Sequence, residues 1–171
     1  MKHSALGYLL AAIYCLGVLG SGPAPAAAVN HTEGVLGATN ALLLVIDGLN
    51  EELAAQGLSR MKVEQSISSR LLAAGVQVVP ENGFAAAKGA GVLTLRIRLN
   101  RAPFYFYMYN INLTLNSKLP VTEGSGAFTT IPTWTEGWVG ALQPTEAGQL
   151  QAFAEELLTR FLAQRAAERG S

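Results

Sequence analysis

Two runs of alternating apolar and polar residues, at 92–99 and 104–115, constrain the fold of this chain more than any other feature. In the first run the odd positions from Leu93 to Leu99 are apolar, and the even positions are mostly polar. The second run carries its longer apolar series on odd positions too, and it is rich in Phe and Tyr. A period of two residues is typical of strands with one buried face. The pair predicts a β-hairpin with its odd face toward the core.

The two apolar series also predict the register of this hairpin. Both lie on one face only if odd residues pair with odd ones, because a slip of one residue would turn a whole series outward. We therefore expect Leu99 opposite Tyr105 and Ile97 opposite Tyr107, with a three-residue turn at 101–103.

The same register predicts cation–aromatic neighbours on the even face. It sets Arg98 near Phe106 and Arg96 near Met108. A cation over an exposed ring contributes about 0.5–1 kcal/mol, which is enough to order the pair but not to explain the fold.

Further strands and two helices complete the predicted fold. Apolar runs predict strands at 41–46 and 76–79, and a Thr-rich segment interrupted by Pro132 predicts an edge or bulged strand at 128–139. Helical spacing predicts one helix between a Ser59 cap and Gly75, and another from a Thr145 cap onward. The order β-α-β-β-β-β-α indicates an α+β fold: a single twisted, mainly antiparallel sheet of about five strands with two helices packed on one face.

The first 28 residues match a secretory signal peptide. Lys2 begins a short basic start, an apolar run follows to Gly20, and small residues precede Val29, with a second possible cleavage site before Ala27. The apolar run is shorter than the ~20 residues of a comfortable membrane span, so an uncleaved anchor is the weaker alternative. Tyr14 before Cys15, the only cysteine, argues against lipid attachment.

This leader divides the chain into four parts. We expect a signal peptide at 1–28, a flexible lead-in at 29–40, a single α+β domain at 41–167 and a tail at 168–171. Twelve Lys and Arg balance twelve Asp and Glu in the whole chain. Such a balance gives no steering toward nucleic acid or an anionic membrane.

The chain after residue 28 is poor in catalytic groups. It holds one histidine, His31, one aspartate, Asp47, and no cysteine. Asp47 before Gly48 is typical of a turn, and Glu136, between two tryptophans, is the one carboxylate with an aromatic setting. The glycines match no phosphate-binding loop. We therefore predict no enzyme activity, no catalytic residue, no metal site and no cofactor.

Aromatic side chains on the even face of the sheet form the one candidate site. If Leu113 pairs with Thr129, Trp134 lies beside Met108 and Trp138 beside Phe104. An exposed apolar patch of this kind marks a partner, ligand or membrane contact. Burial under one helix or under the segment 49–58 would be equally ordinary for large aromatics. The predicted binding residues are Phe104, Phe106, Met108, Trp134, Trp138, Arg96 and Arg98.

Residues 65–79 carry a helix, the spacing Leu71-x-x-x-Gly75 and a short apolar strand. This unit resembles the opening of small periplasmic accessory domains, such as the amino-terminal domain of TolB and the CsgG-like group. The rest is similar to small exported bacterial α/β proteins. The resemblance implies a non-catalytic envelope module that works by protein contact.

These observations lead to one functional hypothesis and one alternative. The hypothesis is a periplasmic or secreted accessory domain that binds another protein through the aromatic sheet face or an edge strand, without nucleic acid or a stable membrane anchor. The alternative is a carrier of a small apolar ligand, with the Phe/Trp cluster lining the cleft.

Overall fold

Six strands form one mixed, mainly antiparallel sheet in the order β1-β6-β5-β4-β2-β3. The computed structural model describes residues 24–31, 34–49, 51–55, 57–102, 106–122 and 126–170. The strands are β1 (Ala24–His31), β2 (Ala41–Asp47), β3 (Gln77–Val78), β4 (Ala90–Arg101), β5 (Tyr107–Pro120) and β6 (Phe128–Leu142). β2 runs parallel to β3 and β4, and the other neighbours are antiparallel. The predicted α+β class is confirmed.

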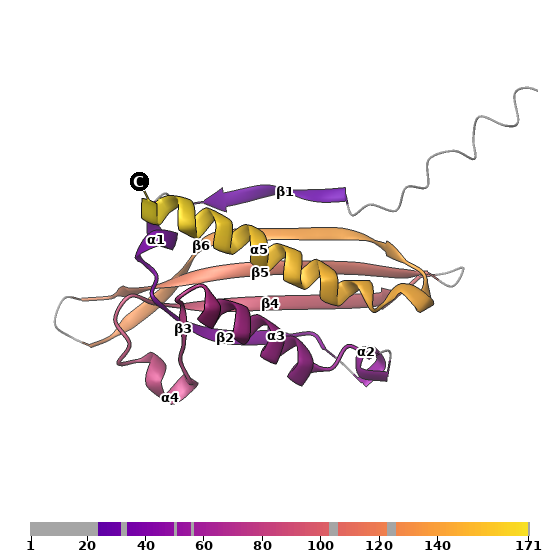
Figure 1. Cartoon of the computed structure of the whole chain (residues 1–171), viewed down its shortest axis with the longest axis horizontal. Helices are drawn as coiled ribbons and strands as arrows, with labels where there is room; N and C mark the ends of the chain where they lie inside the picture. Colours follow the sequence, from indigo (N-terminus) through magenta and orange to yellow (C-terminus); the bar gives the residue numbers. More distant parts are fainter. Residues whose placement is uncertain are drawn as a thin grey trace, which may run out of the picture.

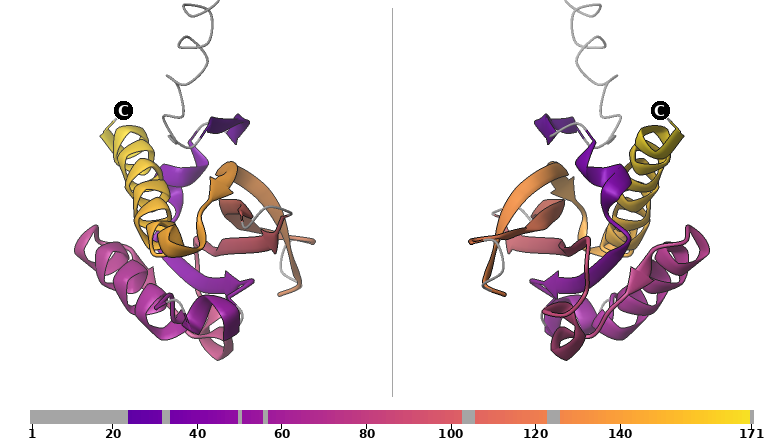
Figure 2. Two further views of the ribbon diagram at one scale, coloured as in Figure 1. Left: turned by 90° about the vertical axis from the view of Figure 1, so that its right-hand side faces the viewer. Right: turned by 90° about the vertical axis from the view of Figure 1, so that its left-hand side faces the viewer.

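The two long helices, α3 (Arg60–Ala73) and α5 (Gln149–Gly170), lie on the same face of this sheet (Figures 1 and 2). Ser59 caps α3 as predicted, because its hydroxyl accepts the backbone N–H of Lys62. Thr145 does not cap α5 but lies inside the 3-10 helix η2 (Pro144–Glu146) that precedes it. Three short helices complete the fold: α1 (Val35–Ala38), α2 (Glu51–Ala55) and α4 (Glu81–Phe84).

The hydrophobic core lies between the sheet and these two helices. The odd residues of β4 and β5 face it, as the alternation predicts, and α3 and α5 add apolar stripes from the other side. Fully buried members from the two strands are Leu93, Leu95, Ile97, Ile111, Leu113 and Leu115. We call the opposite side of the sheet, away from α3 and α5, the outer face.

The β4–β5 hairpin has the predicted parity but a different offset. Leu99 pairs with Tyr109 and Ile97 with Ile111, each four residues further along β5 than expected. The last pair is Arg101 with Tyr107, so the connection is longer than the predicted three-residue turn. Alternation fixes which face a residue takes, and many offsets satisfy it equally well. The predicted neighbours of Arg98 and Arg96 are therefore wrong, since Asn110 and Asn112 stand opposite them.

A β-bulge at Thr133 changes the face of β6 partway along the strand. Leu115 pairs with Trp134, whereas Asn116 pairs with Pro132, so Thr133 has no partner residue in the ladder. The buried Thr133 hydroxyl is satisfied by the Ser117 hydroxyl at 2.8 Å and the Leu115 carbonyl. Beyond the bulge every side chain of β6 takes the face opposite to the predicted one.

Residues 34–40 are packed rather than a flexible lead-in. Leu36 of α1 is fully buried in the core. The backbone N–H of Gly37 donates to Glu168 Oε2 at 3.1 Å. The domain therefore includes these residues, and the predicted tail at 168–170 belongs to the last turn of α5.

The strand β1 includes the last residues of the predicted leader. It pairs antiparallel with β6, from Ala24 opposite Val139 to His31 opposite Trp134, with an irregularity between Ala26 and Asn30. Cleavage of the leader stays a prediction. No helix within the described residues has the length and apolar character to cross a membrane.

Candidate functional site

The predicted aromatic site is split between the two faces of the sheet. Trp134 and Trp138 are 0% and 4% exposed and face the core, because the Thr133 bulge reverses this part of β6. Trp134 meets the ring of Phe161 edge-on at 5.2 Å, and Trp138 meets Phe153 at 5.7 Å. Their assignment to a binding surface is wrong.

Three of the other predicted residues, Arg98, Phe106 and Met108, lie toward the β4–β5 hairpin end of the outer face. Phe106 is 46% exposed and Met108 44% exposed. Met108 stands between Asn100 of β4 and Ala141 of β6. Phe104 lies outside the described residues. We call Arg98, Phe106 and Met108 the hairpin-end patch.

Polar side chains cover the outer face beside this patch. Asn112 donates its amide N–H to Asn110 Oδ1 at 2.8 Å, and the hydroxyls of Thr114 and Thr135 share a hydrogen bond across β5 and β6. The threonine pair is a cross-strand contact and the asparagine pair lies along β5, and polar contacts of both kinds suit a solvated sheet face. Apolar cover on the outer face lies further along the sheet, where Phe84 of α4 clusters with Ala41 and Ala90.

The charged groups of the outer face make it positive at the hairpin end. Arg96 Nε donates to Asp47 Oδ2 at 2.8 Å, and this hydrogen bond, with the positive charges of Arg96 and Arg98, holds the pKa of Asp47 below its usual value. Arg98 is exposed and forms no ion pair with any residue of the described ranges. The positive charge of Arg98 is therefore available to a partner.

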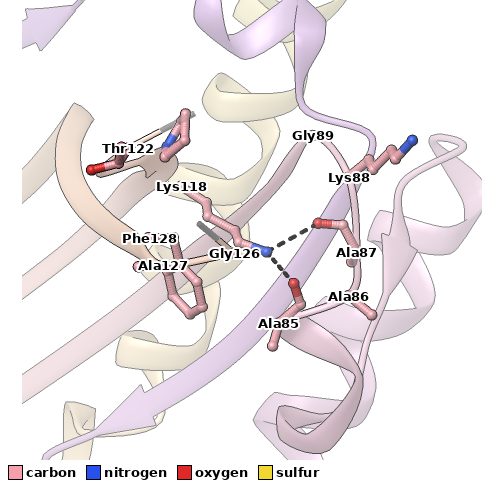
Figure 3. Close-up of a pocket in the computed structure, with 11 residues that line it drawn as sticks. Ala85, Ala86, Ala87, Lys88, Gly89, Lys118, Thr122, Gly126, Ala127 and Phe128 are labelled. Carbon is pink, nitrogen blue, oxygen red and sulfur yellow. Dashed lines mark hydrogen bonds between the residues drawn. The ribbon is translucent and has the colours of Figure 1, made fainter. Parts of the chain in front are cut away.

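A pocket of about 460 Å³ lies at the other end of the sheet, and the sequence analysis did not find it (Figure 3). The loop 85–89 after α4 forms one wall, and the end of the β5–β6 hairpin, with Pro120 and Phe128, forms the other. Lys118 lies between the walls and donates to the carbonyls of Ala85 at 2.5 Å and Ala87 at 3.4 Å. The run Ala85-Ala86-Ala87 was the available signal, since small side chains leave space beside the backbone.

The possible catalytic carboxylates are both held by arginines. Glu136 Oε1 accepts from Arg160 Nη1 at 3.0 Å, and Asp47 is paired with Arg96. His31 lies in β1, opposite Trp134. No cluster of three His, Cys, Asp or Glu side chains that could hold a metal ion occurs in the parts of the chain that the structure describes. Within the described residues one serine hydroxyl meets a carboxylate: Ser66 Oγ donates to Glu155 Oε1 at 3.0 Å, between α3 and α5.

Comparison with known proteins yields a few distant structures. No protein-family model matches the chain, and no curated protein matches it significantly. A minor lipoprotein from Acinetobacter baumannii is 20% identical, covers 76% of this chain and 94% of its own, and has a TM-score of 0.36. Two structures of a PelC dodecamer from Paraburkholderia phytofirmans are 13% and 14% identical. They cover 82% and 81% of this chain and 92% and 93% of their own, with TM-scores of 0.40 and 0.39.

Proteins this distant transfer no function to the chain, and the comparisons add nothing to the resemblance to TolB and CsgG-like domains. That resemblance stays a prediction. The functional argument therefore depends on the surfaces of this chain alone.

Proposed function

We propose that this chain is an exported, non-enzymatic accessory domain that binds a partner protein through the hairpin-end patch. The observation that carries the proposal is that Arg98, which has no ion pair among the described residues, shares the outer face with two exposed apolar side chains, Phe106 and Met108. Met108 lies diagonally across the hairpin from Arg98, within reach of the same partner side chains. Large apolar side chains and arginine are the preferred anchors of protein interfaces.

Charge complementarity specifies the kind of partner. The patch carries a positive charge, and the nearest outer-face carboxylate, Asp47, is already paired with Arg96. A partner segment that presents a carboxylate beside an apolar side chain would satisfy both parts of the patch. An apolar-ligand cleft lined by the Phe/Trp cluster is not proposed, because both tryptophans pack in the core.

Site-specific photo-crosslinking in the organism that encodes the chain tests the patch. A photoreactive residue at position 108 should give a discrete protein adduct. The same residue at Met61, which is 75% exposed on α3, is the matched control and should give none. Arg98→Glu should abolish the adduct without changing the melting temperature. Equal adducts at both positions, or an adduct that persists in Arg98→Glu, would contradict the proposal.

Export is tested separately, by sequencing the amino terminus of the protein isolated from the same cells. A terminus at Val29 or Ala27, in protein recovered outside the cytoplasm, is the expected result. Intact Met1 in cytoplasmic protein would remove export from the proposal and leave the patch to be judged by crosslinking.

A further inference from the structure

We propose that the pocket beside Lys118 binds a small molecule with one carboxylate group and a short apolar body. This site lies between the loop 85–89 and the distal end of the β5–β6 hairpin, so it is independent of the hairpin-end patch. A volume of about 460 Å³ falls in the range of small-molecule sites.

The position of the Lys118 ammonium is fixed before any ligand arrives. It donates to the backbone carbonyls of Phe84 at 3.2 Å, Ala85 at 2.5 Å and Ala87 at 3.4 Å. It also lies 4.5 Å from the ring centre of Phe128 and 5.4 Å from that of Phe84. A group held from several directions loses little freedom on binding, which favours affinity.

These partners satisfy the N–H groups of Lys118 but leave its positive charge in place. Carbonyl oxygens and ring faces carry partial charges only, and Lys118 forms no salt bridge with any described residue. No Asp or Glu is among the described residues that line the pocket. A ligand carboxylate could replace the longest contact, to Ala87, and form a shorter charge-assisted hydrogen bond.

The walls determine the rest of the ligand. Ala85, Ala86 and Ala87 line one side with methyl groups and backbone, while the ring of Phe128 lies on the other (Figure 3). Pro120 adds apolar surface to the lining. An apolar chain between these walls loses contact with water, which is favourable in proportion to the area covered. A charged or strongly polar body would gain no partner there.

Titration of the whole chain with octanoate, octanol and octylammonium, followed by backbone NMR, tests the site. Octanoate should bind saturably and shift the amides of residues 85–89 and 126–128. Octanol should bind about tenfold more weakly, because it lacks the charge-assisted hydrogen bond. Octylammonium should not bind there. Equal affinities for octanoate and octanol, or shifts confined to other regions, would overturn the proposal.

Three variants locate the binding. Lys118→Met should weaken octanoate binding about tenfold or more. Lys88→Gln removes a positive charge from the same loop, but its side chain points away from Lys118 in Figure 3, so it should leave the affinity nearly unchanged. Ala86→Trp keeps Lys118 and fills the pocket with a large side chain. It tests whether octanoate binds in the pocket even if Lys118→Met fails to fold. Octanoate binding that survives Ala86→Trp would overturn the site.

Discussion

The indole Nε1 of Trp134 donates a hydrogen bond to Oε1 of Gln164 at 2.8 Å. This bond ties β6 to α5 at a point where the side chain of Trp134 is wholly buried. A buried indole needs such a partner, because an unsatisfied N–H carries a desolvation penalty. The bond and the burial make Trp134 an anchor between the sheet and its covering helix.

Trp134→Ala should therefore lower the free energy of unfolding by about 3–5 kcal/mol, as large-to-small changes of buried aromatics do. Gln164→Ala, which removes only the acceptor, should cost about 1–2 kcal/mol. Urea unfolding followed by circular dichroism measures both. Met108→Ala is the exposed control and should stay within about 0.5 kcal/mol of the parent chain. A smaller loss for Trp134→Ala than for Met108→Ala would show that the tryptophan is not in the core.

A second buried contact joins α5, at the C-terminal end of the domain, to the residue that follows α1. Arg165 of α5 is 3% exposed, and its Nε and Nη2 both donate to the carbonyl oxygen of Thr39, at 3.0 and 2.9 Å. Burial lowers the pKa of this guanidinium, and the nearby charge of Arg169 lowers it further. Removing the donors would leave a carbonyl without partners at the end of α1.

Arg165→Ala should cost about 2–3 kcal/mol of stability, the size of a lost charged hydrogen bond together with the orphaned carbonyl. Hydrogen exchange should show the amides at 36–39 losing protection before those of β4 and β5. Arg169→Ala, at an exposed position one turn further along α5, removes a repulsive neighbour of Arg165 and should therefore lower neither the stability nor the protection at 36–39. Unchanged protection at 36–39 in Arg165→Ala would show that α1 is held by its apolar contacts alone.

The Asp47–Arg96 pair predicts a particular dependence of stability on pH. The folded-state pKa of Asp47 lies below its unfolded value, so the pair stabilises the fold above the unfolded pKa. That contribution is lost as the pH falls through the folded-state pKa. Asp47→Asn should therefore be less stable than the parent chain at pH 7 and at pH 5, with the difference shrinking toward pH 3. Arg96→Met should give the same pattern, and a difference that grows on acidification would contradict this origin.

Two glycines with positive φ allow the steric cost of an added Cβ to be measured apart from its conformational cost. Gly48 has φ +87°, and a Cβ built on it would lie within 1.9 Å of the Ile97 carbonyl oxygen. Gly57 has φ +89° but faces open space. Gly57→Ala should cost about 1–2 kcal/mol, the conformational penalty alone. Gly48→Ala should cost about 4 kcal/mol or more, because β2 must also move away from β4. Thermal or urea unfolding measures both losses of stability. Equal losses for the two variants would show that the end of β2 accommodates the added methyl group without a clash.

Alternation in the sequence predicts which residues of β4 and β5 face the core. It does not predict which residue of β5 lies opposite a given residue of β4. Hydrophobic burial distinguishes odd from even positions, so Leu93 through Leu99 and Tyr107 through Leu115 could be assigned to the core side. Nothing in that pattern distinguishes Tyr105 from Tyr109 as the partner of Leu99. The offset depends on the length of the connection, whose composition permits several lengths.

The prediction of the candidate site was wrong because of one residue, Thr133. Pro132 indicated an edge or a bulge, but the sequence does not show where the extra residue falls. Its position at Thr133 is fixed by a buried pairing with Ser117, which depends on three-dimensional contact. Phe128, on the near side of the bulge, shares the outer face with Lys118 as the predicted parity requires, whereas both tryptophans beyond the bulge turn inward. The pocket beside Lys118 could not be predicted either, because it joins segments about 30 residues apart in sequence.

The bulge at Thr133 also has a genetic consequence. Loss of that single codon would leave Pro132 opposite Asn116 and Trp134 opposite Leu115 in regular pairing, so both tryptophans would still face the core. Loss of a codon between Trp134 and Trp138 would instead place the two tryptophans three positions apart, and therefore on opposite faces of the sheet. In-frame deletions that the strand tolerates should therefore fall at Thr133, and natural variation in the rest of β6 should consist of replacements.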